Sequence, residues 1–323
     1  SLGFGQDFVD NALLFSRPQP SGSARIQALG GASVSIGGDY SSGLSNPAGL
    51  GMYNRSEFTL SPGLTINKIG STYTESKTDA SKSMFNIPGL SLVYHHETGK
   101  EKGFLGGSFG LTMTRTNDLN RKFRYTGDND QNSIVDYFID DAYGLDPESM
   151  LWRQGQNPGD NFTTLTGLAF NTYLIEDYID VDNNGREVYA YRSVLSPLPA
   201  ENGQPGETRI VRQEEVGESK GAQNQWSISY GANFSDKLFV GAGIGITSIR
   251  YKLTQMFRES DFRYSIDTDY VPIDNFHTNE NYDIRGSGVN FTIGAIFRPL
   301  DFLQLGASLV TPTYYRITDK YTA

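Results

Sequence analysis

The sequence contains no cysteine, and this absence excludes several kinds of chemistry at once. Disulfide frameworks, thiolate metal sites and cysteine nucleophiles all need the missing side chain. Histidine is almost as scarce, with three residues, His95, His96 and His277. His95 and His96 are neighbours on a predicted strand, so their side chains should point to opposite faces and cannot jointly bind one metal ion or haem. Motifs of hydrolases, zinc proteases and nucleotide-binding loops do not occur either, so we expect no enzyme.

Long apolar runs are also missing from the chain. No stretch of roughly 18 apolar residues occurs, and the mean hydropathy is -0.43, so we expect no membrane-spanning helix. A membrane β-barrel is compatible with low hydropathy, because each strand shows lipid only every second residue. The 19 Tyr, 19 Phe and 36 Gly suit such a barrel, with rings at the bilayer interfaces and glycines at close contacts. The chain begins at Ser1 without a signal-peptide pattern, so we expect that an export signal has been removed.

Alternation of apolar and polar residues, the period of a β-strand, is the main structural signal. It predicts seven strands, at about 57–73, 85–95, 104–125, 225–234, 238–253, 289–297 and 303–309. Within the fifth of these, the apolar phase shifts by one residue between Ile246 and Ile249. Such a shift predicts a β-bulge near Thr247 and Ser248.

The connections between these strands fall into two groups by length. Connections at 97–103, 235–237 and 298–301 would lie on one side of the sheet, and those at 76–82, 127–222 and 260–283 on the other. Short turns on one side and long loops on the other are typical of outer-membrane barrels. A closed barrel of this type needs an even number of strands, and seven are predicted. The last residue, Ala323, follows an outward strand and is not the terminal aromatic residue expected of a completed barrel. We therefore expect an all-β fold in which residues 56–323 form part of an antiparallel transmembrane barrel.

The predicted loop at 127–222 carries most of the acidity of the chain. It holds 18 acidic and 6 basic residues, a net charge of -12, whereas the rest of the chain has a net charge of +2. A nucleic-acid partner is therefore not expected, since its binding surface would be basic. Residues 132–139 predict a short amphipathic helix with a Ser or Asn N-cap, and 172–179 form another apolar and acidic segment.

Asp180, Asp182 and Asn184 place oxygen atoms at alternate positions in this loop, before Gly185. This spacing is used by calcium-binding loops, so a structural calcium site is one interpretation. Tyr191 stands where such a loop would supply a bidentate Glu, and an ordinary Asp/Asn/Gly turn is the other interpretation. Both remain open, and we expect no other cofactor.

The segment from Gly22 to Leu50 is too rich in glycine and other small residues to be an ordinary helix or strand. Its characteristic residues are Ser23-Ala24-Arg25, Ala28-Leu29-Gly30-Gly31-Ala32, Asp39, Asn46-Pro47-Ala48 and Gly49-Leu50-Gly51. In this order and place, the segment resembles the N-terminal hatch of the FadL/TodX family of outer-membrane channels for hydrophobic compounds. The resemblance is closest to the Bacteroidetes branch that is often named hemin receptors, although the histidine pattern argues against haem.

The resemblance implies a fourteen-stranded barrel in the outer membrane of a Gram-negative bacterium, with residues 1–55 as a hatch inside the lumen. With about seven strands, residues 56–323 would form about the N-terminal half of this barrel. The surroundings would be outer-membrane lipid and lipopolysaccharide. The implied function is passive uptake of small hydrophobic molecules, such as long-chain fatty acids or aromatic hydrocarbons. Such a ligand would enter an apolar groove of the outer loops, pass a hatch-gated pocket and leave through a lateral opening at a kinked third strand.

The residues that we expect to bind the ligand or gate the pore lie in the hatch and in the third strand. They are Leu13, Leu14, Phe15, Ile26, Leu29, Asn46, Pro47, Ala48, Gly106 and Gly107. Pro47 restricts Asn46 to extended conformations and so favours a bend where the hatch meets the wall. Glycines 30, 31, 37 and 38 should let the hatch backbone pass close to the wall. The third-strand glycines, from Gly103 to Gly110, mark either the kink or small residues that make room for the hatch.

Two other functions are compatible with the sequence. One is an accessory or scaffold barrel of a larger outer-membrane complex, with the acidic loop as the docking surface for a protein partner. The other is a soluble secreted β protein that binds or processes glycans.

Overall fold

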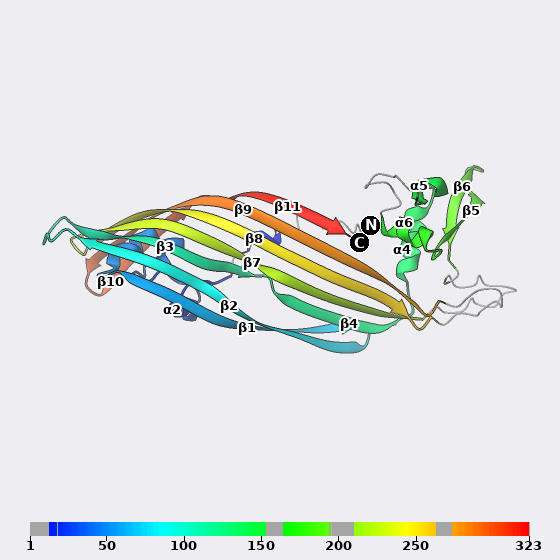
Figure 1. Cartoon of the computed structure of the whole chain (residues 1–323), viewed down its shortest axis with the longest axis horizontal. Helices are drawn as coiled ribbons and strands as arrows, with labels where there is room; N and C mark the ends of the chain where they lie inside the picture. The colour runs from blue at the N-terminus through cyan, green and yellow to red at the C-terminus, as the bar shows by residue number, and fades with distance from the viewer. Residues whose placement is uncertain are drawn as a thin grey trace.

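The fold is elongated and consists mostly of antiparallel β-structure, as the computed structural model shows (Figure 1). The structure describes residues 13–17, 19–152, 164–193, 195, 210–262 and 273–322. Within these ranges, none of the helices has the length and apolar character needed to cross a bilayer.

One large sheet dominates the molecule. Its strands are β1 Glu57–Tyr73, β2 Ser76–Glu97, β3 Phe104–Asp118, β4 Arg121–Asn129, β7 Val211–Phe234, β8 Leu238–Ser260, β9 Asn275–Leu300, β10 Leu303–Val310 and β11 Tyr314–Thr322. They pair in the order β1-β2-β3-β7-β8-β9-β10, with β4 beside β7 and β11 beside β9. The sheet curls like half a barrel, with β1 at one edge and β10 and β11 at the other (Figure 1).

Two pairs of these strands each form one interrupted strand. β3 and β4 follow one another along β7, and β10 and β11 do so along β9. The first interruption lies at Leu119, whose N–H donates to the carbonyl of Gly221 at 3.2 Å. Gly221 has a φ of +152°, a value that glycine adopts readily. The sheet therefore contains seven strand positions, as the alternation of the sequence predicted.

The strands at the long-loop end extend further than predicted. The connection predicted at 76–82 is wrong, because β1 and β2 continue to a two-residue turn at Thr74 and Glu75. β4 continues to Asn129, and β7 begins at Val211, so both ends of the predicted 127–222 loop are strand. These extensions are polar on both faces, which hid them from a search for alternation.

The β-bulge predicted near Thr247 and Ser248 is also wrong. β8 pairs with β7 and with β9 without any register shift from Leu238 to Ser260. The apolar residues change faces instead. Ile246 is exposed on one face, whereas Ile249 is buried on the opposite face. The shift of the apolar positions in the sequence therefore reflects a change in which face of the regular strand is apolar.

The N-terminal segment, of which residues 13–17 and 19–53 are described, packs against one face of the curled sheet (Figure 1). It contains α2 Ala24–Ala28, α3 Ser42–Ser45 and the 3₁₀ helix η1 Pro47–Met52. We call the sheet face that it covers the inner face, and the opposite one the outer face. α2 is short because Gly30, with a φ of +66°, follows its C-cap residue Leu29.

A small outer unit lies beyond the long-loop end of the sheet (Figure 1). It consists of α4 Ile134–Ala142, α5 Pro147–Met150, α6 Leu165–Asn171, β5 Glu176–Val181 and β6 Glu187–Arg192. The predicted helix is confirmed as α4, which begins with a capping box between Ser133 and Asp136. The segment predicted at 172–179 leads into β5. The apolar core of the outer unit includes Phe138, Met150 and Ile175.

Glu259 attaches this unit to the sheet. Its side chain is fully buried and accepts hydrogen bonds from Ser133 Oγ at 2.5 Å and from the N–H of Ile134 at 2.9 Å. Gln213 Nε2 donates to the same carboxylate at 2.6 Å. A carboxylate at the first turn of α4 also faces the positive end of the helix dipole. The outer unit is therefore tied to β7 and β8 through one buried acidic group.

Candidate functional site

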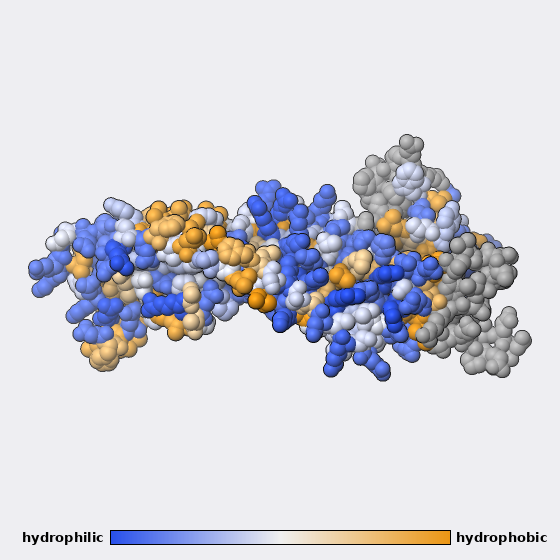
Figure 2. Space-filling model, turned by 60° about the horizontal axis from the view of Figure 1, so that its bottom comes forward, coloured by the Kyte–Doolittle hydropathy of each residue, from blue (hydrophilic) through white to orange (hydrophobic). Residues whose placement is uncertain are grey.

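The outer face of the sheet is apolar over the part of the strands next to the short turns. On β7, Ile228 is 41% exposed, whereas the neighbouring Ser229 on the inner face is 2% exposed. β8 and β9 repeat this pattern, with Ile244 and Phe291 exposed outside and Thr292 buried inside. In Figure 2, hydrophobic residues gather over part of the left half of the molecule, and mostly hydrophilic residues cover its middle. The usual arrangement of a water-soluble sheet, with its polar side outward, is thus reversed.

Aromatic residues mark the short-turn end of the apolar region. His96 stacks on Tyr230 at a centroid distance of 6.0 Å and contacts Phe104, which in turn contacts Phe234. His95 points the other way and bonds Ser108 Oγ through Nδ1 at 2.9 Å. The predicted opposite orientation of the two histidines is confirmed.

Asn46 is the main polar contact between the N-terminal segment and the sheet. Its side chain is fully buried, and Nδ2 donates to the carbonyl of Val34 at 2.7 Å. The same nitrogen lies 3.3 Å from the carbonyl oxygens of Ala295 and Ala307, on β9 and β10. Oδ1 accepts from the N–H of Ala48 at 3.1 Å and so caps η1. Asn46 has the extended backbone that the following proline favours, with a φ of -150° and a ψ of 97°.

Glycines on the inner face of the sheet, which we also call the wall, provide the space that η1 occupies. A Cβ added to Gly241 would lie 2.3 Å from the carbonyl carbon of Pro47, and one added to Gly231 would lie 2.5 Å from its carbonyl oxygen. At Gly306, the nearest atom would be the carbonyl oxygen of Val34 at 2.4 Å. Backbone therefore packs directly on backbone here, and any side chain would separate the two layers.

The glycines predicted to allow this approach were those of the N-terminal segment, and that prediction is wrong. A Cβ at Gly30 or Gly38 would meet no atom within 4 Å, and one at Gly31 would meet only Pro20. Gly37 packs against Met52 and the carbonyl of Gly49, within the segment itself. These four glycines serve contacts and turns within the segment. The close approach depends on the sheet glycines and on Gly51 of the segment, where an added Cβ would lie 2.7 Å from the carbonyl oxygen of Ala232.

Polar side chains of the inner face pair with backbone groups of the N-terminal segment. Ser229 Oγ donates to the carbonyl of Gly43 at 3.1 Å, and Ser308 Oγ donates to that of Ser45 at 2.7 Å. Gln304 donates to the carbonyl of Ser35. An irregular segment has many backbone carbonyls that no helix or sheet hydrogen bond satisfies. Burying it therefore requires polar side chains on the sheet that can donate to these carbonyls.

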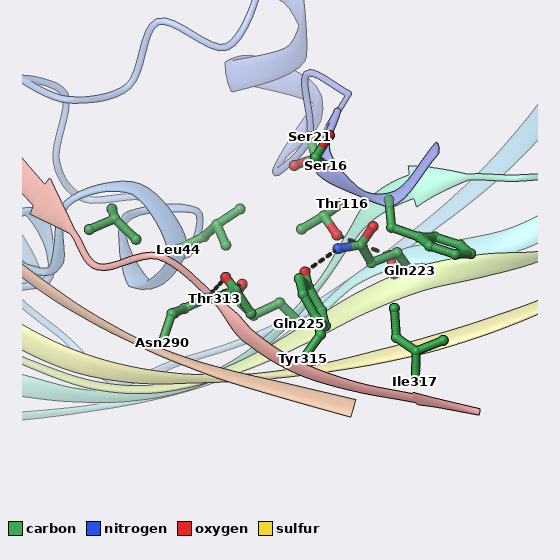
Figure 3. A pocket seen from close by; sticks show the side chains of 12 residues that line it. Ser16, Ser21, Leu44, Thr116, Gln223, Gln225, Asn290, Thr313, Tyr315 and Ile317 are labelled. Carbon is green, nitrogen blue, oxygen red and sulfur yellow. Dashed lines mark hydrogen bonds between the residues drawn. The ribbon is translucent and has the colours of Figure 1, made fainter. Parts of the chain in front are cut away.

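A cavity of about 600 Å³ lies between the N-terminal segment and the inner face near β9 and β11 (Figure 3). It is lined by Phe15, Ser16, Ser21, Leu44, Thr116, Gln223, Gln225, Asn290, Val310, Thr313, Tyr315 and Ile317. Its size is in the range of small-molecule sites. Phe15 also packs edge-on against Tyr251, at a centroid distance of 6.2 Å, beside the buried Leu119 and Ile249.

The expected binding residues of the N-terminal segment have different positions relative to this cavity. Phe15 lines it, whereas Leu14 packs next to Phe15 in the neighbouring apolar cluster. Leu13 and Leu29 are 45% and 49% exposed, and Ile26 is buried next to Gly22. Pro47 and Ala48 are buried against the wall, where Ala48 contacts Phe239 and Ile296.

The third-strand glycines do not act as a group. Gly106 has a φ of +157° and lies at a register shift between β3 and β7, which is the local irregularity expected of a kink. Gly107 lies beneath the Tyr230 hydroxyl on the outer face, since a Cβ there would be 2.4 Å from that oxygen. Gly110 faces Leu50 and is the one of these three that makes room for the N-terminal segment.

The segment from Asp180 to Gly185 forms the turn between β5 and β6. Asp182 Oδ1 accepts from the N–H groups of Asn184 and Arg186, both at 2.8 Å, and Gly185 has a φ of +76°. The hydrogen bond from Arg186 is the main cause that lowers the pKa of the Asp182 carboxyl below its ordinary value. Asp180 uses one oxygen for the N–H of Val181. These donors fit a hairpin turn, and the described residues contain no group of three or more acidic, His or Cys side chains arranged for a metal ion.

Several cavity residues were not predicted from the sequence, namely Gln223, Gln225, Asn290, Thr313 and Tyr315. They come from β7, β9 and β11, with Thr313 directly before β11, and they are polar like most of the inner face. The available signal was the polar phase of the alternation, which marks a face of the sheet and does not mark a position along it.

Comparisons with known proteins give no family for this chain. No protein-family model matches the sequence, and no curated protein matches it. Among solved structures, a chain described as "Asymmetric conductivity of engineered proteins" aligns with 83% of this chain and 99% of its own length. Its sequence identity is 8% and its TM-score 0.11, a level at which the likeness carries no argument. The FadL/TodX resemblance therefore stays a prediction from the residues.

Proposed function

We propose that this protein is an outer-membrane channel that admits small hydrophobic molecules by passive diffusion. The curled sheet would form part of a membrane barrel, and the N-terminal segment would be its hatch. The observation that carries the proposal is the reversed polarity of the sheet, apolar outside and polar inside. Water would disfavour this arrangement, whereas lipid outside and a hydrated or plugged lumen inside would favour it.

The extent of the apolar region fits the thickness of a membrane. It covers nine residues of β7, from Trp226 to Phe234, and the residues paired with them on β8 and β9. At about 3.3 Å per residue, nine residues extend for about 30 Å along the strand. A tilt of about 40° reduces this to roughly 23 Å, close to the ~25 Å apolar band of outer-membrane barrels.

The edges of the sheet support a larger barrel. Within the described part of the chain, β1 and β10 each have one neighbouring strand. An unpaired strand edge cannot be exposed to hydrocarbon, because its backbone groups would lack hydrogen-bond partners. We propose that further strands complete the wall, as the fourteen-stranded family pattern implies.

The cavity gives the proposed channel a place to hold its ligand. A hydrophobic molecule would reach it between the hatch and the wall, next to Phe15 and Leu44. Each methylene that leaves water contributes about 0.8 kcal/mol, so no covalent step or energy source is needed for capture. Passage into the cell envelope then requires a movement of the hatch, whose contacts centre on Asn46.

Uptake measurements test this proposal. Cells that express the wild type, a deletion of Ser1 to Phe15, or Pro47→Ala at matched levels would be compared for uptake of a labelled hydrophobic compound. A small polar solute is the control for general leakiness, and Asn183→Ala in the exposed β5–β6 turn is the matched surface variant. We expect the first two variants to change hydrophobic uptake and Asn183→Ala to leave it unchanged.

Equal hydrophobic uptake in all four strains would overturn the channel proposal. The scaffold function, with the acidic outer unit as its docking surface, would then become the better explanation. In that case the protein purified in mild detergent should carry a stoichiometric protein partner.

A further inference from the structure

The cavity next to Phe15 is lined without any charged side chain among the residues that the structure describes. Its polar members are hydroxyl and amide groups, and its apolar members are Phe15, Leu44, Val310 and Ile317. An ionised ligand group would find no opposite charge in this lining. The desolvation of that group would therefore stay uncompensated.

Most of the polar groups in the lining are already paired with each other. Asn290 Nδ2 donates to Thr313 Oγ1 at 2.9 Å, and to Gln225 Oε1 at 3.2 Å. Gln223 Nε2 donates to the Tyr315 hydroxyl at 2.7 Å (Figure 3). These pairs hold the amides in fixed orientations and leave them little capacity for a second partner.

Among the described residues of the lining, Gln223 Oε1 is the buried side-chain atom that has no hydrogen-bond partner. The side chain of Gln223 is 5% exposed, and no donor reaches this oxygen from the part of the chain that is described. Its amide nitrogen is held by Tyr315, which fixes the orientation of the amide, and Gln223 is one of the residues that line the cavity. A buried acceptor without a partner costs free energy, which a ligand that donates a hydrogen bond would recover.

We infer that the cavity selects uncharged hydrophobic molecules that carry a hydroxyl donor, such as long-chain alcohols or alkylphenols. The donor would bond Gln223 Oε1, and the hydrocarbon part would lie against Phe15, Leu44 and Ile317. This inference rests on the proposed function and specifies its substrate class. Corresponding carboxylates are disfavoured, because their negative charge would face an acceptor oxygen in a neutral lining.

Three ligands with the same twelve-carbon chain test the inference. They are 1-dodecanol, n-dodecane and dodecanoate, each labelled with tritium and bound to the purified barrel in nanodiscs at pH 8. The alcohol should bind about tenfold more tightly than the alkane, the effect of one neutral hydrogen bond to a buried acceptor. Dodecanoate, which is ionised at this pH, should bind more weakly than both.

Variants identify the group responsible. Gln223→Leu should reduce the preference for dodecanol over dodecane to about one, while dodecane binding persists or improves. Gln255→Leu is the matched control, since Gln255 also donates one hydrogen bond, to Glu215 at 2.8 Å. Gln255 lies near the long-loop end of β8 and does not line the cavity. This variant should keep the preference of the wild type.

The possible results separate the two proposals. Equal binding of dodecanol and dodecane, or tighter binding of dodecanoate, would overturn the inference and leave the channel proposal intact. A preference for dodecanol that Gln223→Leu retains would also overturn it, because the donor would then bond another group. No saturable binding of any of the three ligands would overturn both.

Discussion

Replacing Asn46 by Ala should detach the N-terminal segment from the wall while the sheet stays folded. The substitution removes the 2.7 Å hydrogen bond to Val34, the two 3.3 Å contacts to β9 and β10, and the cap of η1. A buried neutral hydrogen bond contributes about 1 kcal/mol, and loss of an N-cap costs about 1 kcal/mol. With the weaker contacts, we expect a loss of about 2 to 4 kcal/mol in docking free energy, a 30- to 1000-fold rise in the undocked population.

Hydrogen–deuterium exchange measures this loss directly. Amides of α3 and η1 should exchange faster in Asn46→Ala by the factor given above, whereas those of β7 and β8 should keep the rates of the wild type. Asn46→Asp should be at least as damaging, since a carboxylate would face the carbonyl oxygens of Val34, Ala295 and Ala307. Asn183→Ala is the control at an exposed asparagine. If α3 and η1 exchange at the wild-type rate in both Asn46 variants, the argument that this side chain holds the segment is refuted.

Four further predictions concern the outer face of the sheet, the β5–β6 turn and the outer unit. A lipid-soluble thiol reagent should label a cysteine at Phe291 far more than one at Thr292, and equal labelling would contradict the assigned faces. Asp182→Ala should raise exchange in the β5–β6 turn equally with calcium and with chelator, whereas protection that needs calcium would restore the metal interpretation. In the wild type, this turn should loosen as the pH falls below 3.8, because the lowered pKa of Asp182 contributes stability above that value. Glu259→Ala should free α4, with a loss on the order of 3 kcal/mol that exchange of the α4 amides would show, and unchanged exchange there would contradict it.

The strands could be predicted from the sequence where the sheet separates two different environments. Between Trp226 and Phe234, one face is apolar and the other polar, so the period of two is visible. At 76–82 and 211–222 both faces are polar, and the same backbone structure leaves no periodic signal. The shift after Ile246 was visible but ambiguous, since a bulge and an exchange of faces produce the same sequence pattern.

The candidate site was predictable only in its local parts. The bend at Asn46 follows from the proline after it, and the apolar character of Phe15 follows from its own side chain. The pairing of Gln223 with Tyr315 joins residues that lie 92 positions apart, and it depends on how β7, β9 and β11 are aligned. Neither spacing nor composition contains that alignment. The wall glycines were missed for the same reason, because their role depends on what packs against them.

The exchange of apolar faces along β8 has a consequence for how the barrel would enter a bilayer. Asn224, Ser248 and Ser287 lie directly opposite one another on three adjacent strands, at the level where the exchange occurs. Beyond this row, Arg250 and Lys252 point outward, so pushing the sheet deeper would carry cations into hydrocarbon. Each would cost about 2 to 4 kcal/mol at the midplane. Withdrawing the sheet would expose Trp226 and Ile246 to water, so the proposed barrel would rest at one depth in a bilayer, and its strands themselves would set that depth.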